Sequence, residues 1–425
     1  MFRKGCSFLA KLIIEGPCRL KGEVFIHGAK NSALPLLSAC LLCGSPCVLH
    51  NCPRLSDVSV CLKILTHLGC KITRSGHTVT VDPTTVTACD IPDDLMRQMR
   101  SSIVFLGAIL SRTGQAKLSL PGGCELGPRP IDLHLSALRQ LGASITESHG
   151  NLTCTAPRGL VGGTVSLTFP SVGATENLML AAVCAKGVTV IHNAAREPEI
   201  CDLAKFLNRC GARISGAGEG TILINGVHSL HGCTHTVIAD RIEATTYLAA
   251  AAVTGSSLTL RHVAPAHLTG VLPVFEEAGC TLRAQGNTLH ITAPARLSPL
   301  RSVRTMPYPG FPTDAQAPVM AMTTLASGAS IFVETIFSGR YKHVGELCRM
   351  GANITTEGSV AVVKGVSSLS GAIVHAAELR GAAALVVAGL AAQGSTTIHG
   401  LQYLNRGYER LEAMLQMLGA VVRKK

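Results

Sequence analysis

The sequence contains no tryptophan, and aromatic residues make up only 4% of its 425 positions. Proteins that bind single-stranded nucleic acid present aromatic side chains on which bases stack, so this scarcity argues against such a function. No apolar run reaches the roughly 18 residues that a transmembrane helix needs. Near the N-terminus, Lys11 and Glu15 interrupt the apolar stretch, so we expect neither a signal peptide nor a membrane span.

The chain is also short of acidic residues. Asp and Glu number 26 against 38 Lys and Arg, which gives a formal net charge of +12. A positive balance of this size favours anionic partners. Because the basic residues are dispersed rather than gathered in runs, we expect small anionic substrates and not nucleic acid. The sequence leaves the oligomeric state open.

Cysteine, by contrast, is abundant, with 17 residues. So many cysteines in a large chain are typical of a reducing compartment, where thiols pack as small hydrophobic groups, and we expect a cytoplasmic protein. One C-x-x-C pair, Cys40 and Cys43, lies in an apolar segment, and no second pair accompanies it. We therefore expect these thiols to pack in the core and predict no metal site.

One short pattern, apolar-Gly-small-x-apolar, recurs six times along the chain. Its glycines lie between 68 and 73 residues apart, at Gly69, Gly142, Gly211, Gly279, Gly351 and Gly419. Such a period indicates one supersecondary unit used repeatedly. Each glycine follows a stretch of helical apolar periodicity, where it fits a left-handed C-cap, and a pair of short strands comes next.

Each repeat also carries a second helix that is apolar all round, as in the segments 33–44, 173–187 and 380–394. A helix of this kind is buried on every side. Strands and helices alternate, so the fold class is α/β. The six repeats could form one ring, two groups of three or three pairs, and the pattern alone does not choose among them.

The predicted starts of the buried helices carry residues suited to anions. Helix N-termini expose unpaired amides and a positive partial charge, which attract phosphate and carboxylate groups. The starts include Lys30, Arg100, the segment 171–175 and Asp314. A cation at a helix start opposes the dipole, so an anionic ligand near Lys30 or Arg100 would remove the conflict.

The loop 120–134 differs from its counterparts in the other repeats because it is rich in glycine and proline. It presents Cys124 away from apolar neighbours and close in sequence to Arg129. A thiol near a guanidinium has a depressed pKa and is reactive. Equivalent loops supply Arg340 and Arg406, and together these cations suit a doubly or triply anionic substrate.

Seven motifs carry a resemblance to a known family: G-A-K-N-S-A-L-P (28–35), P-G-G-C-E-L-G-P-R-P-I-D-L-H (121–134), S-V-G-A-T-E-N (171–177), N-A-A-R-E-P-E-I (193–200), D-R-I-E (240–243), F-P-T-D-A-Q (311–316) and R-G-Y-E-R (406–410). Through them the chain resembles the enolpyruvyl transferases, and within that family the members that act on UDP-N-acetylglucosamine. The resemblance extends over nearly the whole chain from about Leu12.

The resemblance implies the family's inside-out α/β barrel, with two domains that each hold three βαβαββ-type units around buried central helices. It places one domain, with the catalytic cysteine loop, at 31–238, and a discontinuous domain at 1–30 plus 239–425. The active site is expected in the cleft between them.

The resemblance also implies an activity. The enolpyruvyl group of phosphoenolpyruvate would pass to the 3-hydroxyl of UDP-N-acetylglucosamine by addition and elimination, with release of phosphate, as the first committed step of peptidoglycan synthesis. No cofactor is required. Cys124 resembles the family's proton donor, which forms a covalent adduct with phosphoenolpyruvate and is alkylated by fosfomycin. Asp314 resembles the residue that takes the hydroxyl proton, and Lys30 and Arg406 complete the catalytic set.

The remaining site residues are carried over by the same resemblance. Those expected to bind phosphoenolpyruvate are Lys30, Asn31, Arg129, Arg340 and Arg406. Those expected to bind UDP-N-acetylglucosamine are Asn31, Arg100, Arg129, Pro130, Ile131, Asp132, Leu133, Ser171, Val172, Gly173, Asp314 and Ile336. The chain departs from the family pattern at Glu378 and at Asn405, where aspartate is usual.

Two alternatives remain open at this point. A shikimate-phosphate enolpyruvyl transferase would share the fold but lacks the P-G-G-C loop. A catalytically silent paralogue would bind the nucleotide sugar and regulate synthesis, but the presence of Cys124, Asp314 and the full set of cations argues against it.

Overall fold

The computed structural model describes residues 10–120 and 131–425. The chain divides into two compact units, and we describe each by itself. Within the described residues, unit 1 comprises 10–27 and 239–425, and unit 2 comprises 28–120 and 131–238. The first boundary falls three residues before the position expected from the sequence, so Lys30 belongs to unit 2.

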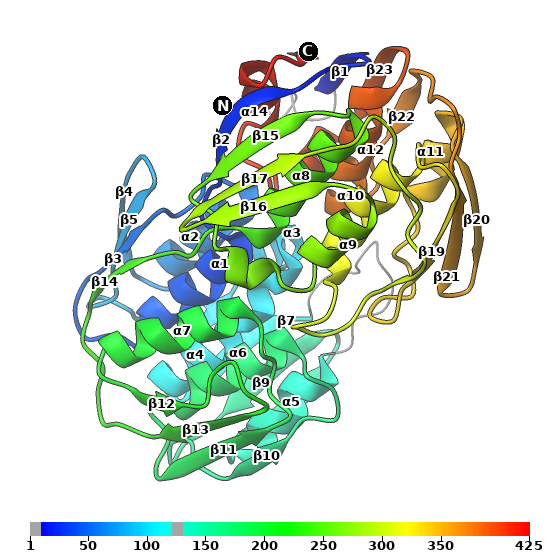
Figure 1. The fold of residues 1–425 in the computed structure, drawn as a ribbon. Coiled ribbons are helices and arrows are strands. Elements are labelled where there is room, and N and C mark those ends of the chain that lie inside the picture. Colours follow the sequence, from blue (N-terminus) through cyan, green and yellow to red (C-terminus); the bar gives the residue numbers. More distant parts are fainter. Residues whose placement is uncertain (1–9, 121–130) are drawn as a thin grey trace. The chain divides into compact units, whose positions relative to one another are not determined.

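Each unit contains three four-stranded sheets, whose strands can be followed by colour in Figure 1. In unit 2 the sheet orders are β14-β3-β5-β4, β6-β7-β9-β8 and β10-β11-β13-β12. The strands are β3 (Cys47–His50), β4 (Lys71–Ser75), β5 (Thr78–Asp82), β6 (Asp90–Ile91), β7 (Gln115–Ser119), β8 (Ser144–Ser148), β9 (Asn151–Thr155), β10 (Thr164–Ser166), β11 (Val188–His192), β12 (Arg213–Ser215), β13 (Thr221–Asn225) and β14 (Thr234–Thr236).

In unit 1 the sheet orders are β16-β17-β15-β2, β18-β19-β21-β20 and β22-β23-β1-β24. The strands are β1 (Lys11–Gly16), β2 (Lys21–Phe25), β15 (Ser257–Arg261), β16 (Thr281–Gln285), β17 (Thr288–Thr292), β18 (Val303–Arg304), β19 (Ala329–Val333), β20 (Asn353–Glu357), β21 (Val360–Lys364), β22 (Ile373–His375), β23 (Gly394–His399) and β24 (Val421–Lys424).

All six sheets share one topology, in which a parallel pair at one edge is followed by two antiparallel pairings. This confirms the α/β class and settles the open arrangement as three repeats and three repeats. The first strand, β1, pairs with both β23 and β24, so the N-terminus completes the sheet of the last repeat.

Six helices are buried along nearly their whole length, as the apolar segments predicted. They are α1 (Lys30–Ala39), α4 (Phe105–Thr113) and α6 (Val172–Ala182) in unit 2, and α8 (Arg241–Val253), α10 (Thr313–Thr323) and α12 (Leu379–Ala391) in unit 1. Within unit 1 each of the three packs against the other two. Each unit has its own apolar core, to which all three of its buried helices contribute side chains.

Six further helices alternate with the buried ones: α2 (Ser56–His67), α5 (Asp132–Gln140), α7 (Pro198–Arg209), α9 (Leu272–Glu277), α11 (Val344–Arg349) and α14 (Leu411–Met417). Shorter turns of helix are η1 (Cys40–Leu42), α3 (Asp93–Gln98), η2 (Arg100–Val104), η3 (Pro265–Leu268) and α13 (Leu401–Leu404). No helix among the described residues is long and apolar enough to cross a membrane.

The repeated glycines take the conformation that the sequence predicted. Each follows the C-cap of an amphipathic helix with φ between +90° and +104°. At Gly69 a Cβ atom would lie 2.5 Å from the carbonyl oxygen of Thr85, so a side chain is excluded by space as well as by φ. One expectation is wrong: Arg100 does not begin the buried helix α4, because it begins η2, which lies between α3 and α4.

Candidate active site

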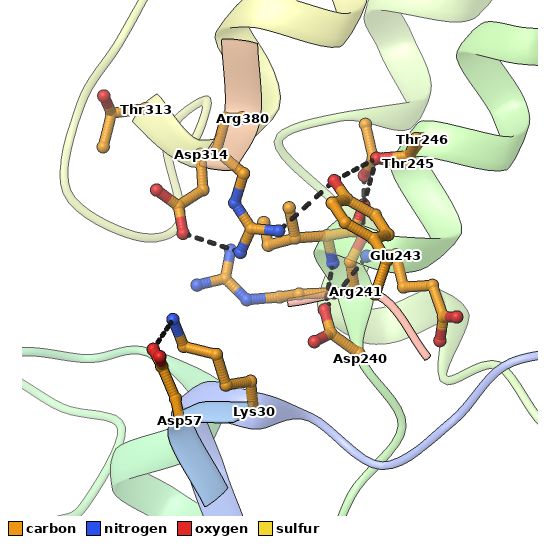
Figure 2. Close-up of polar contacts among 12 residues, drawn as sticks. Lys30, Asp57, Asp240, Arg241, Glu243, Thr245, Thr246, Thr313, Asp314 and Arg380 are labelled. Atoms are coloured by element: carbon orange, nitrogen blue, oxygen red, sulfur yellow. Dashed lines mark hydrogen bonds and ion pairs between the residues drawn. The ribbon is translucent and has the colours of Figure 1, made fainter. Parts of the chain in front are cut away.

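In unit 1 the expected base, Asp314, lies at the N-terminal end of a buried helix (Figure 2). Asp314 is the second residue of α10, where the helix dipole favours a negative charge. It does not cap the helix, because Pro312 occupies the N-cap position. Its side chain retains 28% exposure, so a carboxylate held on a rigid helix remains open to a ligand.

Two buried arginines fix the Asp314 carboxylate from both sides. Nη2 of Arg340 lies 2.9 Å from Oδ1, and Nη2 of Arg380 lies 3.0 Å from Oδ2. The arginine side chains are 1% and 3% exposed. Arg340 also donates two hydrogen bonds to the carbonyl oxygen of Thr313. The carboxylate oxygens are thus oriented by two charge-assisted hydrogen bonds, the stronger kind.

Arg380 is itself held by aromatic and hydroxyl partners. Its Nη1 atom donates to the Tyr408 hydroxyl at 3.3 Å, and its guanidinium lies 5.6 Å from the centre of that ring. The Tyr408 hydroxyl contacts Thr246 on α8 at 2.8 Å. Burial alone would lower the pKa of Arg380, but the Asp314 carboxylate raises it, so the guanidinium stays charged.

Ile336, an expected sugar-nucleotide contact, lies half-buried after β19 in a turn organised by a buried carboxylate. The two Glu334 oxygens accept from the Ile336 amide at 2.8 Å, the Phe337 amide at 3.0 Å and the Thr313 hydroxyl at 3.0 Å. The hydrogen bond from Thr313 therefore ties this turn to the start of α10, where Asp314 lies. Arg406, half-buried after α13, belongs to the same unit.

In unit 2 the first residue of α1 is Lys30, whose side chain is 9% exposed. Its ammonium lies 2.9 Å from Oδ2 of Asp57 on α2, which is 2% exposed (Figure 2). Asp57 thus supplies one negative charge that offsets the unfavourable position of Lys30 at a helix start. Asn31 follows on the same turn and is half-buried.

The other expected nucleotide-sugar residues of unit 2 lie on three neighbouring segments. Ser171 caps α6 by accepting from the Ala174 amide at 3.3 Å, and Val172 and Gly173 begin that helix. Ile131 precedes α5, which begins with Asp132 and Leu133. Arg100 begins η2.

A buried network ties these three segments together. Asn177 on α6 donates to the Ile103 carbonyl of η2 at 2.9 Å and contacts the His134 ring on α5 at 2.8 Å. Its Oδ1 accepts from the Gly107 amide at 2.7 Å. A Cβ atom at Gly173 would lie 3.0 Å from the His134 ring, so a larger residue there would press against the imidazole. Three expected catalytic or binding residues, Cys124, Arg129 and Pro130, lie outside the described residues.

Comparison with known proteins identifies the family. A family model described as EPSP synthase (3-phosphoshikimate 1-carboxyvinyltransferase) matches residues 14–415. UDP-N-acetylglucosamine 1-carboxyvinyltransferase 2 of Caldanaerobacter subterraneus subsp. tengcongensis is 50% identical over 412 residues, which cover 97% of this chain and 99% of that protein. UDP-N-acetylglucosamine 1-carboxyvinyltransferase 1 of Symbiobacterium thermophilum is 50% identical, covering 97% and 94%. The chain belongs to the enolpyruvyl transferase family.

Solved structures of enolpyruvyl transferases agree with this assignment. The enolpyruvyl transferase NikO of Streptomyces tendae matches with a TM-score of 0.89 at 26% identity, covering 98% of this chain and 99% of that chain. EPSP synthase of Acinetobacter baumannii matches with a TM-score of 0.75 at 19% identity, covering 98% and 99%. The second likeness shows the shared fold alone.

The departure from the family pattern at Glu378 has a structural account in this enolpyruvyl transferase. The Glu378 side chain caps α12 by accepting from the amides of Arg380, at 2.8 Å, and of Gly381. The longer glutamate side chain therefore still caps the N-terminus of a buried helix. Asn405, the second departure, is exposed at the end of α13.

Sequence reasoning missed several residues that organise the site: Asp57, His134, Asn177, Arg380 and Tyr408. His134, Asn177 and Tyr408 lie in the seven motifs, Asp57 lies on an amphipathic helix, and Arg380 lies on the buried helix α12. None of them shows its partner in the linear sequence. Asp57 reads as a first-turn acid that favours the dipole of α2. Only its contact with Lys30 reveals a second role.

Proposed function

We propose that this protein transfers the enolpyruvyl group of phosphoenolpyruvate to the 3-hydroxyl of UDP-N-acetylglucosamine with release of phosphate. The observation that carries the proposal is the 50% identity, over almost the full length of both chains, to relatives named UDP-N-acetylglucosamine 1-carboxyvinyltransferase. The fixed carboxylate of Asp314 and the buried cations of both units supply the groups that such a reaction needs.

The addition step needs one proton removed and one delivered. Asp314 takes the proton of the sugar 3-hydroxyl as that oxygen attacks C2 of the enolpyruvyl group. The Cys124 thiol, in the sequence motif quoted above, delivers a proton to C3. General acid–base catalysis of this kind contributes roughly 10²–10⁴-fold. Arg340 and Arg380 hold the Asp314 carboxylate in one orientation, so the base is positioned before the acceptor arrives.

The elimination step restores the double bond. A proton leaves C3, the bond from C2 to the phosphate oxygen breaks, and phosphate departs. Lys30, Arg129, Arg340 and Arg406 are proposed to bind the phosphate and carboxylate of phosphoenolpyruvate, since fixed cations stabilise charge that develops in the transition state. Asn31 and the nucleotide-sugar residues named above hold the acceptor. The proposed product serves peptidoglycan synthesis in the cytoplasm.

A phosphate-release assay tests the proposal directly. Purified protein receives phosphoenolpyruvate with UDP-N-acetylglucosamine, with shikimate 3-phosphate or with no acceptor. We expect release only with the nucleotide sugar. Release with shikimate 3-phosphate instead would favour the runner-up activity, and tight nucleotide-sugar binding without any release would indicate a silent paralogue.

A further inference from the structure

A cluster of cysteines lies in unit 2 at the opposite end of α1 from Lys30. Cys43 follows η1, Cys47 begins β3 and Cys210 caps the C-terminus of α7. All three side chains are completely buried, and their sulfur atoms all lie within 4.8 Å of one another. A fourth thiol, that of Cys233, has its sulfur 3.4 Å from the sulfur of Cys210.

The backbone around these thiols is hydrogen-bonded into one piece. The Val48 amide, next to Cys47, donates to the Cys233 carbonyl at 2.9 Å. Strand β14, which begins at Thr234 directly after Cys233, pairs with β3. The His231 amide donates to the Cys210 carbonyl at 2.9 Å, and the Gly44 amide donates to the Leu230 carbonyl at 2.8 Å. The four sulfur atoms are therefore presented by segments that already hold each other in place.

These sulfur separations fit a tetrahedral zinc ion. Zinc binds thiolate sulfur at about 2.3 Å in structural sites, and a tetrahedron of that size places its sulfur atoms about 3.8 Å apart. The three sulfur atoms of Cys43, Cys47 and Cys210 lie within 4.8 Å of one another, and the Cys233 sulfur lies 3.4 Å from that of Cys210. Cys233 is not within 4.8 Å of all three, so its side chain would have to turn toward Cys43 and Cys47 to complete the tetrahedron. The spacing of Cys43 and Cys47, C-x₃-C, is also within the usual range for zinc ligands.

We propose that Cys43, Cys47, Cys210 and Cys233 bind a structural zinc ion, a site separate from the residues assigned to catalysis. Soft thiolates select zinc and copper(I), and a closed set of four sulfur donors suits zinc. Cys40, the other half of the C-x-x-C pair, donates its thiol to the Leu36 carbonyl at 3.3 Å, and we leave it outside the ligand set.

A disulfide between Cys210 and Cys233 would use only two of the four thiols and leave Cys43 and Cys47 as unexplained buried neighbours. Zinc uses all four. Binding releases the thiol protons and joins η1, β3, α7 and β14 at a single point. Because α1 runs from Lys30 to the start of η1, the ion would anchor the far end of the helix that carries Lys30.

Metal analysis of the full chain, purified under reducing conditions, tests the proposal. We expect one zinc per chain and, by X-ray absorption at the zinc edge, a shell of four sulfur atoms at about 2.3 Å. Protein stripped of metal by a chelator should regain one zinc when zinc chloride is added. Cuprous ion is offered in a parallel titration.

Variants locate the site. Cys210→Ser and Cys43→Ser should each lower the affinity for zinc at least ~10-fold in a competition titration with a chelator, since even loss of a second-shell partner costs about 10–100-fold in affinity. Cys154→Ser is the matched control, because Cys154 is equally buried in unit 2 but outside the cluster, and its affinity for zinc should be unchanged. The absorption experiment uses the unaltered protein, so it decides the question even if a variant fails to fold.

Three results would overturn the proposal. The first is a chain that neither carries nor takes up zinc, in which case the thiols pack as hydrophobic groups. The second is a zinc shell of nitrogen and oxygen atoms, which would place the ion elsewhere. The third is stoichiometric binding of cuprous ion without zinc binding.

Discussion

At the scale of single residues, Asp314 is the group whose surroundings are best defined. Both of its oxygens are held by buried guanidinium groups, yet the side chain remains partly open to solvent. Removing its charge would leave Arg340 and Arg380 facing a neutral group. The residue was found from the sequence by resemblance, whereas the role of Arg380 in holding it came only from the structure.

We expect Asp314→Asn to lower kcat by ~10²-fold or more, in line with the usual contribution of a general base. An amide can accept the hydroxyl's hydrogen bond but takes no proton, so affinity for UDP-N-acetylglucosamine should fall much less. Steady-state kinetics and calorimetric binding measure the two effects. Asp93→Asn, which removes an exposed carboxylate paired with Arg97, is the control and should leave kcat unchanged. Near-normal turnover in Asp314→Asn would remove the residue from the mechanism.

A second residue-scale prediction concerns His343, whose two buried ring nitrogens have no hydrogen-bond partner among the described residues. Burial, and then the charge of Arg340, lower its pKa from 6.5 to about 3. Between these values the imidazole is protonated in the unfolded chain but neutral in the folded one. The unfolded state then binds more protons, so stability falls as pH falls below about 6.5.

The His343 contribution can be isolated by comparing variants. From pH 7 to pH 5 the wild type should lose about 2 kcal/mol more free energy of unfolding than His343→Gln, since a full proton difference is worth roughly 1.4 kcal/mol per pH unit. Denaturant unfolding at both pH values measures this. His228→Gln, which removes an exposed imidazole, should lose as much as the wild type. Equal losses in the wild type and His343→Gln would show that the imidazole is not buried.

At the scale of elements, the contact between α1 and α2 involves Lys30, which is proposed to act in catalysis, and Asp57. Lys30 and Asp57 form a buried pair at 2.9 Å. Removing one partner of a buried pair costs roughly 3–5 kcal/mol, because the other charge is left uncompensated. We therefore expect Asp57→Asn to lose about 3 kcal/mol of stability and to bind phosphoenolpyruvate more weakly.

Denaturant unfolding and phosphoenolpyruvate titration measure these effects of Asp57→Asn. The double variant Asp57→Asn with Lys30→Met should recover part of the lost stability, since it removes the unpaired ammonium, while staying inactive. If the single variant is as stable as the wild type, the pair makes no energetic contribution and Lys30 is held by other contacts.

Much of the element-scale organisation could be predicted from the sequence. The six periodic glycines mark the ends of six helices, because the backbone takes the left-handed conformation there and glycine adopts it most readily. The buried helices were also predictable from local sequence, because their segments are apolar on every side. The two short elements before α4, α3 and η2, were not predicted. A helix as short as α3, with the exposed ion pair of Asp93 and Arg97, shows no apolar period in the sequence.

Long-range partnerships were not predictable in this way. The sequence search for a metal site looked for a second C-x-x-C pair and found none. The structure instead brings Cys210 and Cys233, from α7 and the edge of β14, to the thiols that follow η1. Neither the spacing nor the neighbours of these cysteines indicates the cluster in the sequence. The cluster depends on the pairing of β14 with β3, two strands that are separated by most of the chain of unit 2.

At the scale of the whole molecule, the distribution of thiols makes a chemical prediction. Among the described cysteines nearly all are buried or half-buried, and Cys348 is exposed. Cys124 lies in the glycine-rich motif outside the described residues. We expect fosfomycin to add one label per chain, on Cys124, and to add it faster with UDP-N-acetylglucosamine present.

Peptide mapping by mass spectrometry locates the fosfomycin label. Cys348→Ser should be labelled like the wild type, and Cys124→Ser should not be labelled. A label on Cys348, or one spread over several cysteines, would contradict the assignment of Cys124 as the reactive thiol.

The account as a whole depends on addition and elimination at the 3-oxygen of the nucleotide sugar. Proton NMR of the products formed in deuterated water tests this most directly. If the account is right, UDP-N-acetylglucosamine gains an enolpyruvyl ether at its 3-oxygen, and deuterium enters the methylene group, because a proton from an exchangeable donor is added to C3 before another leaves. An ether formed on shikimate 3-phosphate instead, a different linkage on the sugar, or a methylene group without deuterium would contradict it.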